Sequence, residues 1–389
     1  MKILGIVAEY DPFHNGHLFH ITKAKQLISP DYIYIALSPC FKQRGELSLL
    51  SPIDRAMCAL RAGANAVFCL PVVWTVRDAQ RYALGAVSLL SSLGVTHLAF
   101  GAETPDAGLL SMSAEILESP TPAFSISLKK HLASGCGYPF ALSAALGSVL
   151  PAAKGLLDKP NNTLAVCYLR AIRRLGFPIE PVIIPRSGSY HADTIDPSAP
   201  SASSLRESLL RGCYSDTYSA VPAWTADLLR MRFLESRIPD ETIFDSILLT
   251  RLRIMNEAEY NSLPDLSEGM ENALRTASAS ARSLKELTTF LTGKRYTSAR
   301  ICRLCASALL GITKTSADAS LLPQNALLLG LRTNPKMTSL WKDLPIPVIS
   351  SFSDWKKAAH PTDLAAWRLW AECCRLPDTL PFSEKIIRL

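Results

Sequence analysis

Short apolar runs alternate with amphipathic runs over roughly the first hundred residues, and this alternation restricts the fold more than any other feature of the chain. Four runs have the composition of buried strands, namely residues 2–10, 32–39, 66–72 and 95–103. The segments between them are typical of helices, at residues 16–28, 51–64 and 79–94. Strand, helix and strand in turn predict an α/β fold, in which right-handed connections place helices on both faces of a parallel sheet.

The strand signal weakens further along the chain. Residues 107–175 are predicted to be mainly helical, and one more strand is expected at residues 179–187. Beyond that strand helical patterns dominate, except for a short α/β piece near residues 324–352. We therefore predict an α/β parallel-sheet domain over residues 1–215 and a mainly helical domain over residues 216–389.

Composition excludes several classes of protein. Hydrophobic residues make up 48% of the 389 residues and charged residues 19%, so the chain can bury a sizeable core and is not disordered. No apolar run reaches the ~20 residues that span a bilayer, and no export signal precedes the first strand, so we expect a cytoplasmic protein. The net charge of +7 favours polyanionic partners. The ten cysteines are expected to be reduced thiols; Cys302 and Cys305 have zinc-site spacing, but no second pair follows them.

The loop after the first strand has an unusual composition, in the stretch GIVAEYDPFHNGHLFH over residues 5–20. The strand is expected to end near Glu9, and a turn shaped by Gly16 leads into a helix. Ligands of parallel α/β sheets bind at the carboxyl ends of the strands, and a helix N-terminus there suits phosphate. His14 and His17 are placed to donate hydrogen bonds to phosphate oxygens.

Two other interpretations of this loop stay open. The imidazoles of His14, His17 and His20 are common metal ligands, and Glu9 or Asp11 would be needed to complete a shell. The histidines would otherwise only cap the helix and pack. Three of them around a turn after a buried strand favour a phosphate site over packing alone.

Residues His14–His17 (HNGH) resemble the HxGH signature of the nucleotidyltransferase superfamily, which includes the class I aminoacyl-tRNA synthetases. The wider stretch resembles the tRNA(Met) cytidine acetate ligase family. Further similar segments are QRGE at 43–46, FGAE at 100–103, KPNN at 159–162, PRSGSYH at 185–191, SASSLR at 201–206 and KRYTSAR at 294–300. The resemblance covers roughly the first 300 residues, and it implies a Rossmann-like nucleotidyltransferase domain.

The resemblance implies a two-step reaction. Acetate attacks the α-phosphate of ATP to give acetyl-adenylate and pyrophosphate, and the N4 amine of the wobble cytidine of elongator tRNA(Met) then takes the acetyl group as AMP leaves. Acetate is already ionised at pH 7, so the first step needs positioning and charge neutralisation and no general base. Mg²⁺ is expected to accompany ATP, and no separate protein metal site is expected.

The resemblance also assigns site residues. His14 and His17 would be catalytic, facing the phosphates. The ATP-binding loop would comprise Val7, Ala8, Glu9, Tyr10, Asp11, Pro12, Phe13, His14, Asn15, Gly16, His17, Leu18, Phe19 and His20. Further ATP contacts would come from Gly101, Asn161, Asn162, Arg186 and Ser187. Gly101 would allow close approach of adenosine, or else serve as a turn glycine. One of Asn161 and Asn162 is expected to cap a helix, and the choice of ATP contact between them is open.

The serine-rich motif and Asp11 each allow more than one role. Ser203, Ser204 and Arg206 resemble the serine-rich phosphate motif of nucleotidyltransferases, and helix capping explains the serines equally well. The family usually has asparagine at the position of Asp11. A carboxylate near a triphosphate is repulsive unless Mg²⁺ or an arginine intervenes, so Asp11 has such a partner or caps the turn.

The tRNA would meet a basic surface. No acidic residue lies between Glu286 and Asp318, and the expected RNA-binding residues there are Lys294, Arg295, Tyr296, Arg300 and Arg303. On a helix Tyr296, Arg300 and Arg303 would share one face; the bland alternative is a solvated charged face. Gln43 and Arg44 are candidates for holding the tRNA end or acetate.

Two rival functions remain. A small-molecule adenylyltransferase would keep AMP on its product, but such enzymes are usually compact and the long helical part argues against it. A nucleic-acid-binding protein with a decayed nucleotide site is disfavoured by the intact His14, Gly16 and His17. We therefore predict an ATP-dependent ligase that acetylates the wobble cytidine of elongator tRNA(Met).

Overall fold

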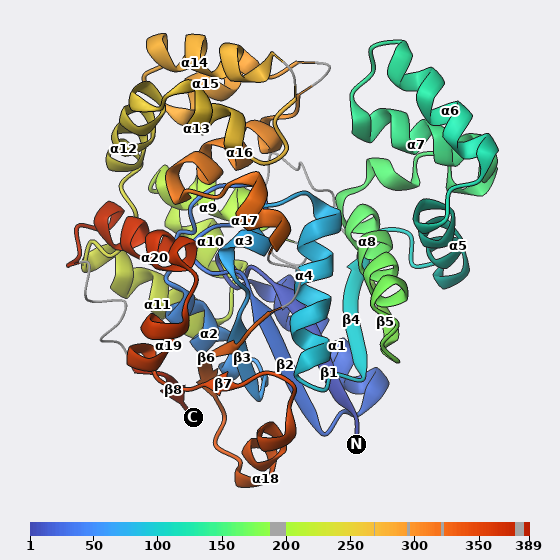
Figure 1. The fold of residues 1–389 in the computed structure, drawn as a ribbon. Coiled ribbons are helices and arrows are strands. Elements are labelled where there is room, and N and C mark those ends of the chain that lie inside the picture. Colours follow the sequence, from blue (N-terminus) through green and yellow to red (C-terminus); the bar gives the residue numbers. More distant parts are fainter. Residues whose placement is uncertain (187–199, 268, 294–295, 320–322, 378–384) are drawn as a thin grey trace.

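The fold is a mainly parallel sheet with helices on both faces and a helical group beside its carboxyl edge (Figure 1). The structure is a computed structural model that describes residues 1–389 apart from 187–199, 268, 294–295, 320–322 and 378–384. The strands are β1 Ile3–Ala8, β2 Tyr32–Leu37, β3 Ala66–Cys69, β4 His97–Ala102, β5 Glu180–Pro185, β6 Ala326–Leu331, β7 Val348–Ile349 and β8 Ile387–Arg388. Their order is β5-β4-β1-β2-β3-β6-β7, and β8 pairs with β6.

Helices accompany the first five strands in the first part of the chain. They are α1 Asn15–Ile28, α2 Pro52–Arg61, α3 Val72–Thr75, α4 Ala79–Ser92, α5 Ala107–Glu118, α6 Pro122–Ala133, α7 Tyr138–Val149, α8 Pro160–Leu175 and α9 Ala202–Leu210. In Figure 1, α4 and α8 cover the near face of the sheet and α1 lies behind it. The predicted parallel sheet with helices on both faces is confirmed.

The second part is mainly helical, as predicted. Its helices are α10 Tyr214–Ser219, α11 Ala223–Leu234, α12 Glu241–Ile254, α13 Glu257–Ser262, α14 Met270–Ser280, α15 Leu284–Leu291, α16 Ser298–Leu310, α17 Lys314–Ala319, α18 Pro335–Ser339, α19 Phe352–Ala358 and α20 Pro361–Cys373. No helix among the described residues is long and apolar enough to cross a bilayer.

Local sequence signals explain the element boundaries. Ser51 caps α2 by accepting a hydrogen bond from the Asp54 amide (3.0 Å), and Pro52 occupies the first helical turn. Gly176 ends α8 in the left-handed conformation that glycine adopts without strain. The strands β1 and β2 are almost continuously buried, as expected of parallel strands that are covered on both faces.

The late α/β piece completes the sheet of the first part. Strand β6 pairs antiparallel with β3, and Ala66 lies opposite Leu331. All other strand pairs between described residues are parallel. One continuous apolar core therefore runs from the sheet into the helical part. The division of the chain near residue 215 stays a prediction.

Candidate active site

The predicted site residues lie at or after the carboxyl ends of β1, β2, β4 and β5, and in the first turn of α8. These strands are parallel, so their carboxyl ends share one edge of the sheet, where ligands of open α/β folds bind. The loop after β1 leads into α1, the end of β4 carries Gly101 and Glu103, and β5 is followed by Arg186. Ser187 lies outside the described residues.

His14 and His17 form a stacked imidazole pair at the N-terminus of α1. His14 is the N-cap residue, and its ring centroid lies 3.5 Å from that of His17 with 20° between the planes. The His14 backbone amide donates to Nδ1 of His17 (3.2 Å). Because Nδ1 of His17 accepts, the proton of this neutral ring lies on Nε2, which is left to donate to a ligand.

Burial keeps the three histidines of this loop neutral. It lowers the pKa of His14 to about 3 and that of His20 to about 4, and the positive charge of Arg186 acts in the same direction. The pKa of His17 is also lowered well below its ordinary value, mainly by burial. Within the described residues, both ring nitrogens of His14 and Nε2 of His20 are buried without a hydrogen-bond partner. Such groups are rare unless a ligand supplies the partner.

The stacking weighs against metal chelation by the histidines. Ring nitrogens point outward in the plane of each ring, so two nearly parallel rings do not converge on one ion. The described part of the chain contains no group of three or more His, Cys, Asp or Glu side chains that could hold a metal. Cys302 and Cys305 are buried in α16, and burial raises the pKa of Cys302 to about 11, so its thiol packs as a small neutral group.

Gly16 allows the His14 ring to fold back over the start of α1. A Cβ atom at this position would lie 3.0 Å from Cε1 and 3.1 Å from Nδ1 of His14. These contacts are tighter than ordinary van der Waals contact, so a side chain would push the ring away. In the described structure the neighbour of Gly16 is therefore the imidazole of His14.

Gly101 lies within strand β4, so its alternative role as a turn glycine was wrong. Among the described residues nothing requires a glycine there. A Cβ atom would meet described neighbours only at 3.9 Å, namely Arg186 and the Ile184 carbonyl. With respect to the described part of the chain, the absence of a side chain therefore leaves space beside Arg186 at the carboxyl end of β4.

The first turn of α8 is bound by an acidic side chain that the sequence reasoning did not single out. Glu103 accepts hydrogen bonds from the Asn161 amide (3.2 Å), the Asn161 side chain (2.6 Å) and the Asn162 amide (2.8 Å). A carboxylate at a helix N-terminus is favourable for its hydrogen bonds and for the helix dipole. The prediction that Asn161 or Asn162 is the N-cap was wrong, because α8 already begins at Pro160 after the cap residue Lys159.

The two asparagines have different surroundings. Asn162 is fully buried. Its side chain accepts a hydrogen bond from the Thr104 amide (2.9 Å) and donates to the Thr104 hydroxyl (3.0 Å) and the Leu156 carbonyl (3.2 Å). Asn161 instead accepts a hydrogen bond from Nη1 of Arg186 (3.0 Å). Asn161 therefore connects the end of β5 to the start of α8 at the edge of the candidate site.

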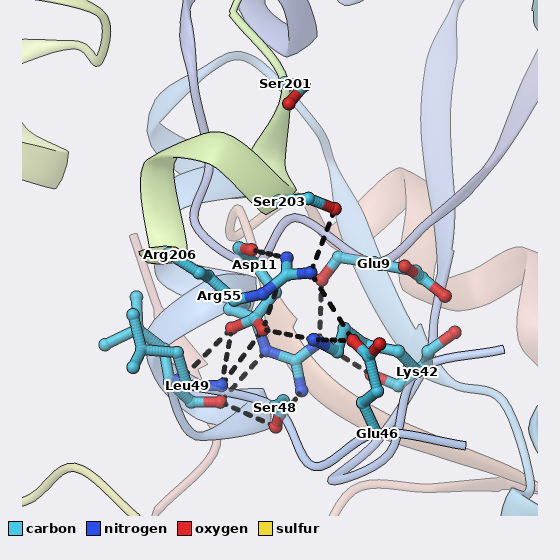
Figure 2. A network of polar contacts seen from close by, with 12 residues as sticks. Glu9, Asp11, Lys42, Glu46, Ser48, Leu49, Arg55, Ser201, Ser203 and Arg206 are labelled. Atoms are coloured by element: carbon cyan, nitrogen blue, oxygen red, sulfur yellow. Dashed lines mark hydrogen bonds and ion pairs between the residues drawn. The ribbon is translucent and has the colours of Figure 1, made fainter. Parts of the chain in front are cut away.

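Asp11 is a buried carboxylate that holds the loop after β2 (Figure 2). It accepts hydrogen bonds from the amide of Leu49 (2.9 and 3.0 Å) and from that of Leu50 (3.1 Å). Nζ of Lys42 lies 4.0 Å and Nη1 of Arg206 3.9 Å from its Oδ2. Of the alternatives left open for Asp11, an arginine partner is present, and a lysine lies at a similar distance.

Arg206 connects the serine-rich motif to the loop after β1. It donates to the Asp11 carbonyl (2.6 Å) and to the Ser203 hydroxyl (3.3 Å), and lies 3.6 Å from Glu46 (Figure 2). The cap of α9 is Ser201, whose hydroxyl accepts from the Ser204 amide (3.1 Å). Capping therefore explains Ser201 and Ser204, and leaves Ser203 and Arg206 facing the loop.

Arg55 is a second residue that sequence reasoning missed. It is fully buried and donates to the Glu9 carbonyl (2.7 Å), the Ser38 carbonyl (2.9 Å) and the Leu50 carbonyl (3.1 Å). A further hydrogen bond reaches the Pro39 carbonyl. This guanidinium ties the carboxyl ends of β1 and β2 together, directly below the loop that carries the histidines.

The segment after β2 joins the site to the helical part. The Gln43 amide donates to the Glu9 carboxylate (2.7 Å), and its side chain donates to the Arg77 carbonyl (2.6 Å). Gly45 has φ +85°, and a Cβ atom there would lie 2.5 Å from the Arg303 backbone nitrogen. This segment therefore packs directly against the backbone of α16.

Comparison with known proteins agrees with this geometry. Residues 1–376 match the family model described as HIGH Nucleotidyl Transferase. A tRNA(Met) cytidine acetate ligase of Fervidobacterium nodosum is 33% identical over 359 residues, which are 91% of this chain and 84% of that protein. Another, from a Thermoanaerobacter species, is 34% identical over 95% of this chain and 94% of its own length. The chain belongs to the tRNA(Met) cytidine acetate ligase family.

Solved structures extend the family likeness to the whole fold. Apo Thermotoga maritima TmcAL superimposes with a TM-score of 0.93 at 27% identity, and the match covers 100% of both chains. The same protein bound with alpha-thio ATP superimposes with a TM-score of 0.90. Family membership therefore covers the final ~80 residues as well, where the sequence had offered little to match.

The RNA-binding residues predicted by resemblance to the family are only partly described. They are Lys294 and Arg295, which lie outside the described residues, and Tyr296, Arg300 and Arg303. The prediction that Tyr296 shares a helix face with Arg300 and Arg303 was wrong, because α16 begins only at Ser298. Arg300 stacks on Tyr296 (5.1 Å) and donates to the Asp265 carbonyl (2.6 Å). Burial lowers the pKa of Arg303. RNA binding by these residues stays a prediction.

Proposed function

We propose that this chain is an ATP-dependent ligase that forms N4-acetylcytidine at the wobble position of elongator tRNA(Met). An oxygen of acetate attacks the α-phosphorus of ATP, the bond to the bridging oxygen breaks, and pyrophosphate leaves. The N4 amine of cytidine then attacks the acetyl carbon, the bond from that carbon to the phosphate oxygen breaks, and AMP leaves. N4 loses one proton to solvent.

The observation that carries the proposal is the neutral His14–His17 pair at the N-terminus of α1. Nε2 of His17 is left to donate, and within the described residues the His14 ring has no hydrogen-bond partner. The amides of the first turn of α1 add a partial positive charge. Donors fixed in advance stabilise the charge that develops on phosphate oxygens without reorganising during the step.

Other groups at the sheet edge support an ATP site. Arg186 supplies a full positive charge, and the side-chain-free face of Gly101 leaves room for adenosine beside it. Of the two asparagines we propose Asn161 as the ATP contact, because the side chain of Asn162 is occupied inside the protein. The binding of alpha-thio ATP by Thermotoga maritima TmcAL supports ATP as the nucleotide.

Mg²⁺ is proposed only as the companion of ATP. The nearest carboxylates are already used: Asp11 by backbone amides, Glu9 by the Gln43 amide, and Glu103 by the start of α8. The residues present therefore do not fit a protein-held Mg²⁺, and no step above passes through one.

The test is a reaction of the purified protein with ATP, radiolabelled acetate and an elongator tRNA(Met) transcript, beside a His17→Ala variant. ATP-dependent label in the tRNA that disappears in the variant supports the ligase. ATP consumption without label in the tRNA would favour a small-molecule adenylyltransferase. RNA binding with no ATP use would leave a nucleic-acid-binding protein with a decayed nucleotide site.

A further inference from the structure

Helices α6 and α7 form a hairpin with an unusual outer surface. We define the α6–α7 surface by the exposed residues Ile126, Lys129, Lys130, Tyr138 and Phe140. On α6 the first three are spaced by three and four residues, so they share one side of the helix. The inner sides of the hairpin contribute Phe124 and Leu146 to the core. The apolar groups on the outer side are therefore additional to those needed to hold the hairpin in place.

The charged side chains of the hairpin are all positive. No acidic residue lies between Glu118 and Asp158, whereas Lys129, Lys130 and Lys154 lie in this segment. All three lysines are exposed, and none forms an ion pair with a residue that the structure describes. Unneutralised lysines on one face attract a polyanion.

Two aromatic side chains are exposed at the start of the second helix of the hairpin. Tyr138 is 55% exposed and Phe140 is 61% exposed, both in the first turn of α7. The ring of Phe140 meets that of His131, at the end of α6, edge to face at 6.5 Å. Exposed aromatic rings next to cations are the groups on which unpaired bases of RNA loops stack.

The position of the hairpin suits a substrate that must reach the candidate ATP site. In Figure 1, α5, α6 and α7 stand on one side of the carboxyl ends of the strands, across from α12–α16. The chain returns from α7 through the exposed Lys154 and Lys159 to the start of α8, where Asn161 contacts Arg186. Two exposed lysines, Lys154 and Lys159, therefore lie on the connection from the hairpin to the site, with the exposed Asp158 directly before Lys159.

Arg300 and Arg303, the described arginines among the residues expected from the sequence to bind RNA, are less accessible than these lysines. Arg300 donates to the Asp265 carbonyl, and Arg303 is only partly exposed. Arg300 would have to give up its carbonyl partner before it could bind phosphate. The lysines of the α6–α7 surface need no such exchange with the described part of the protein.

We propose that the α6–α7 surface binds the tRNA substrate, with Lys129 and Lys130 on phosphates and Tyr138 and Phe140 stacked on unpaired bases. This proposal rests on the proposed function for the identity of the RNA. A second copy of this chain is a poorer occupant, because a symmetric contact would bring two clusters of lysines together.

The first test is direct binding of full-length protein to an elongator tRNA(Met) transcript, measured over a range of salt concentrations. We expect Lys129→Ala/Lys130→Ala to weaken binding about tenfold near physiological salt, and to reduce the slope of log K against log salt by about 1.5. We expect Tyr138→Ala/Phe140→Ala to weaken binding about tenfold with little change in the slope. Binding needs no acetylation, so it can be read even if the proposed function fails.

Matched controls lie at the opposite edge of the sheet. Lys336→Ala/Lys342→Ala removes two exposed lysines near α18, and Phe177→Ala removes an exposed aromatic ring after α8. The controls should bind the tRNA as the wild type does. In the acetylation reaction the α6–α7 variants should raise the KM for tRNA and leave the KM for ATP unchanged.

Three outcomes would overturn the proposal. Unchanged tRNA binding in both α6–α7 variants would show that the surface does not bind the tRNA. An equal loss of tRNA binding in the control variants would show that the effect comes from the net charge of the protein and not from this surface. A change of oligomeric state in the α6–α7 variants, measured by sedimentation, with unchanged tRNA binding would assign the surface to self-association.

Discussion

The contact between Asp11 and Lys42 allows a quantitative test of how the loop after β1 is held. Asp11→Asn keeps the shape of the side chain and removes its charge. Both oxygens of Asp11 accept from the Leu49 amide, so an amide nitrogen in place of one oxygen would set a donor against a donor. The substitution also leaves Lys42 buried with Glu46 (2.7 Å) as its remaining anionic partner in the described structure.

The magnitude follows from the geometry. Two unit charges 4.0 Å apart interact by about 4 kcal/mol at an effective dielectric constant of 20. Glu46 partly neutralises Lys42 and its side chain is 42% exposed, so we expect a coupling energy between Asp11 and Lys42 of about 1–2 kcal/mol. Adding the weakened amide hydrogen bonds, Asp11→Asn alone should lower the free energy of unfolding by about 2–4 kcal/mol.

The assay is a double-mutant cycle of Asp11→Asn and Lys42→Met, with urea unfolding at pH 7.5. The exposed pair Asp354 and Lys357, 3.6 Å apart, supplies the control cycle, for which we expect about 0.3 kcal/mol. A coupling energy for the buried pair no larger than that of the control would refute the reasoning. Asp11 would then hold the loop through its amide hydrogen bonds alone.

Three further predictions concern single positions. Gly101→Ala should leave the free energy of unfolding within about 1 kcal/mol of wild type, because the new methyl group meets no atom of the described residues closer than 3.9 Å, yet raise the KM for ATP about tenfold or more. Gly45→Ala should cost about 2–4 kcal/mol in urea unfolding, because φ is +85° and the methyl group would overlap the α16 backbone at Arg303. The pKa of His14 is lowered from its ordinary value of 6.5 to about 3 in the folded state, so the stability that it contributes is present above pH 6.5 and is lost as the pH falls toward 3. Lowering the pH from 7.5 to 5 should reduce the free energy of unfolding by about 2 kcal/mol through one such group. In urea titrations, His14→Gln should abolish that share of the loss.

Each of these predictions has a control. For Gly101→Ala, the KM for tRNA should not change, and an unchanged KM for ATP would contradict the proposed adenosine site. For Gly45→Ala, Gly212→Ala has a similar φ of +78° and no neighbour within 4 Å, so an equal cost in both would disprove the packing argument. For His14, equal losses of stability between pH 7.5 and pH 5 in wild type and variant would show that its ring is not held neutral.

The sequence predicted the first part of the fold well because the signals there are local. Alternating apolar and amphipathic runs located β1 to β5, and parallel topology then placed their carboxyl ends together. The pairing of β6 with β3 could not be read in the same way. An apolar run of six residues such as ALLLGL specifies a strand but does not specify its partner, which lies more than half the chain away.

The site shows the same division between local and distant information. His14, Gly16 and His17 are neighbours in sequence and could be found there. The roles of Glu103 and Arg55 depend on partners on other elements, and an isolated acidic or basic residue gives no sign of them. The start of α8 was misplaced because the capping carboxylate comes from the end of β4 and not from the asparagines next to the helix.

The antiparallel strand β6 also has a consequence for synthesis of the protein. Roughly 260 residues separate β3 from β6, so at about 5–20 residues per second the edge of β3 stays open for roughly ten to fifty seconds on the ribosome. During that time a short, fully apolar strand, AVFC, presents unpaired backbone groups to other nascent chains. The sheet that carries the candidate site is therefore completed only near the end of translation, and a nascent chain stalled before β6 has an edge suited to chaperones or to aggregation.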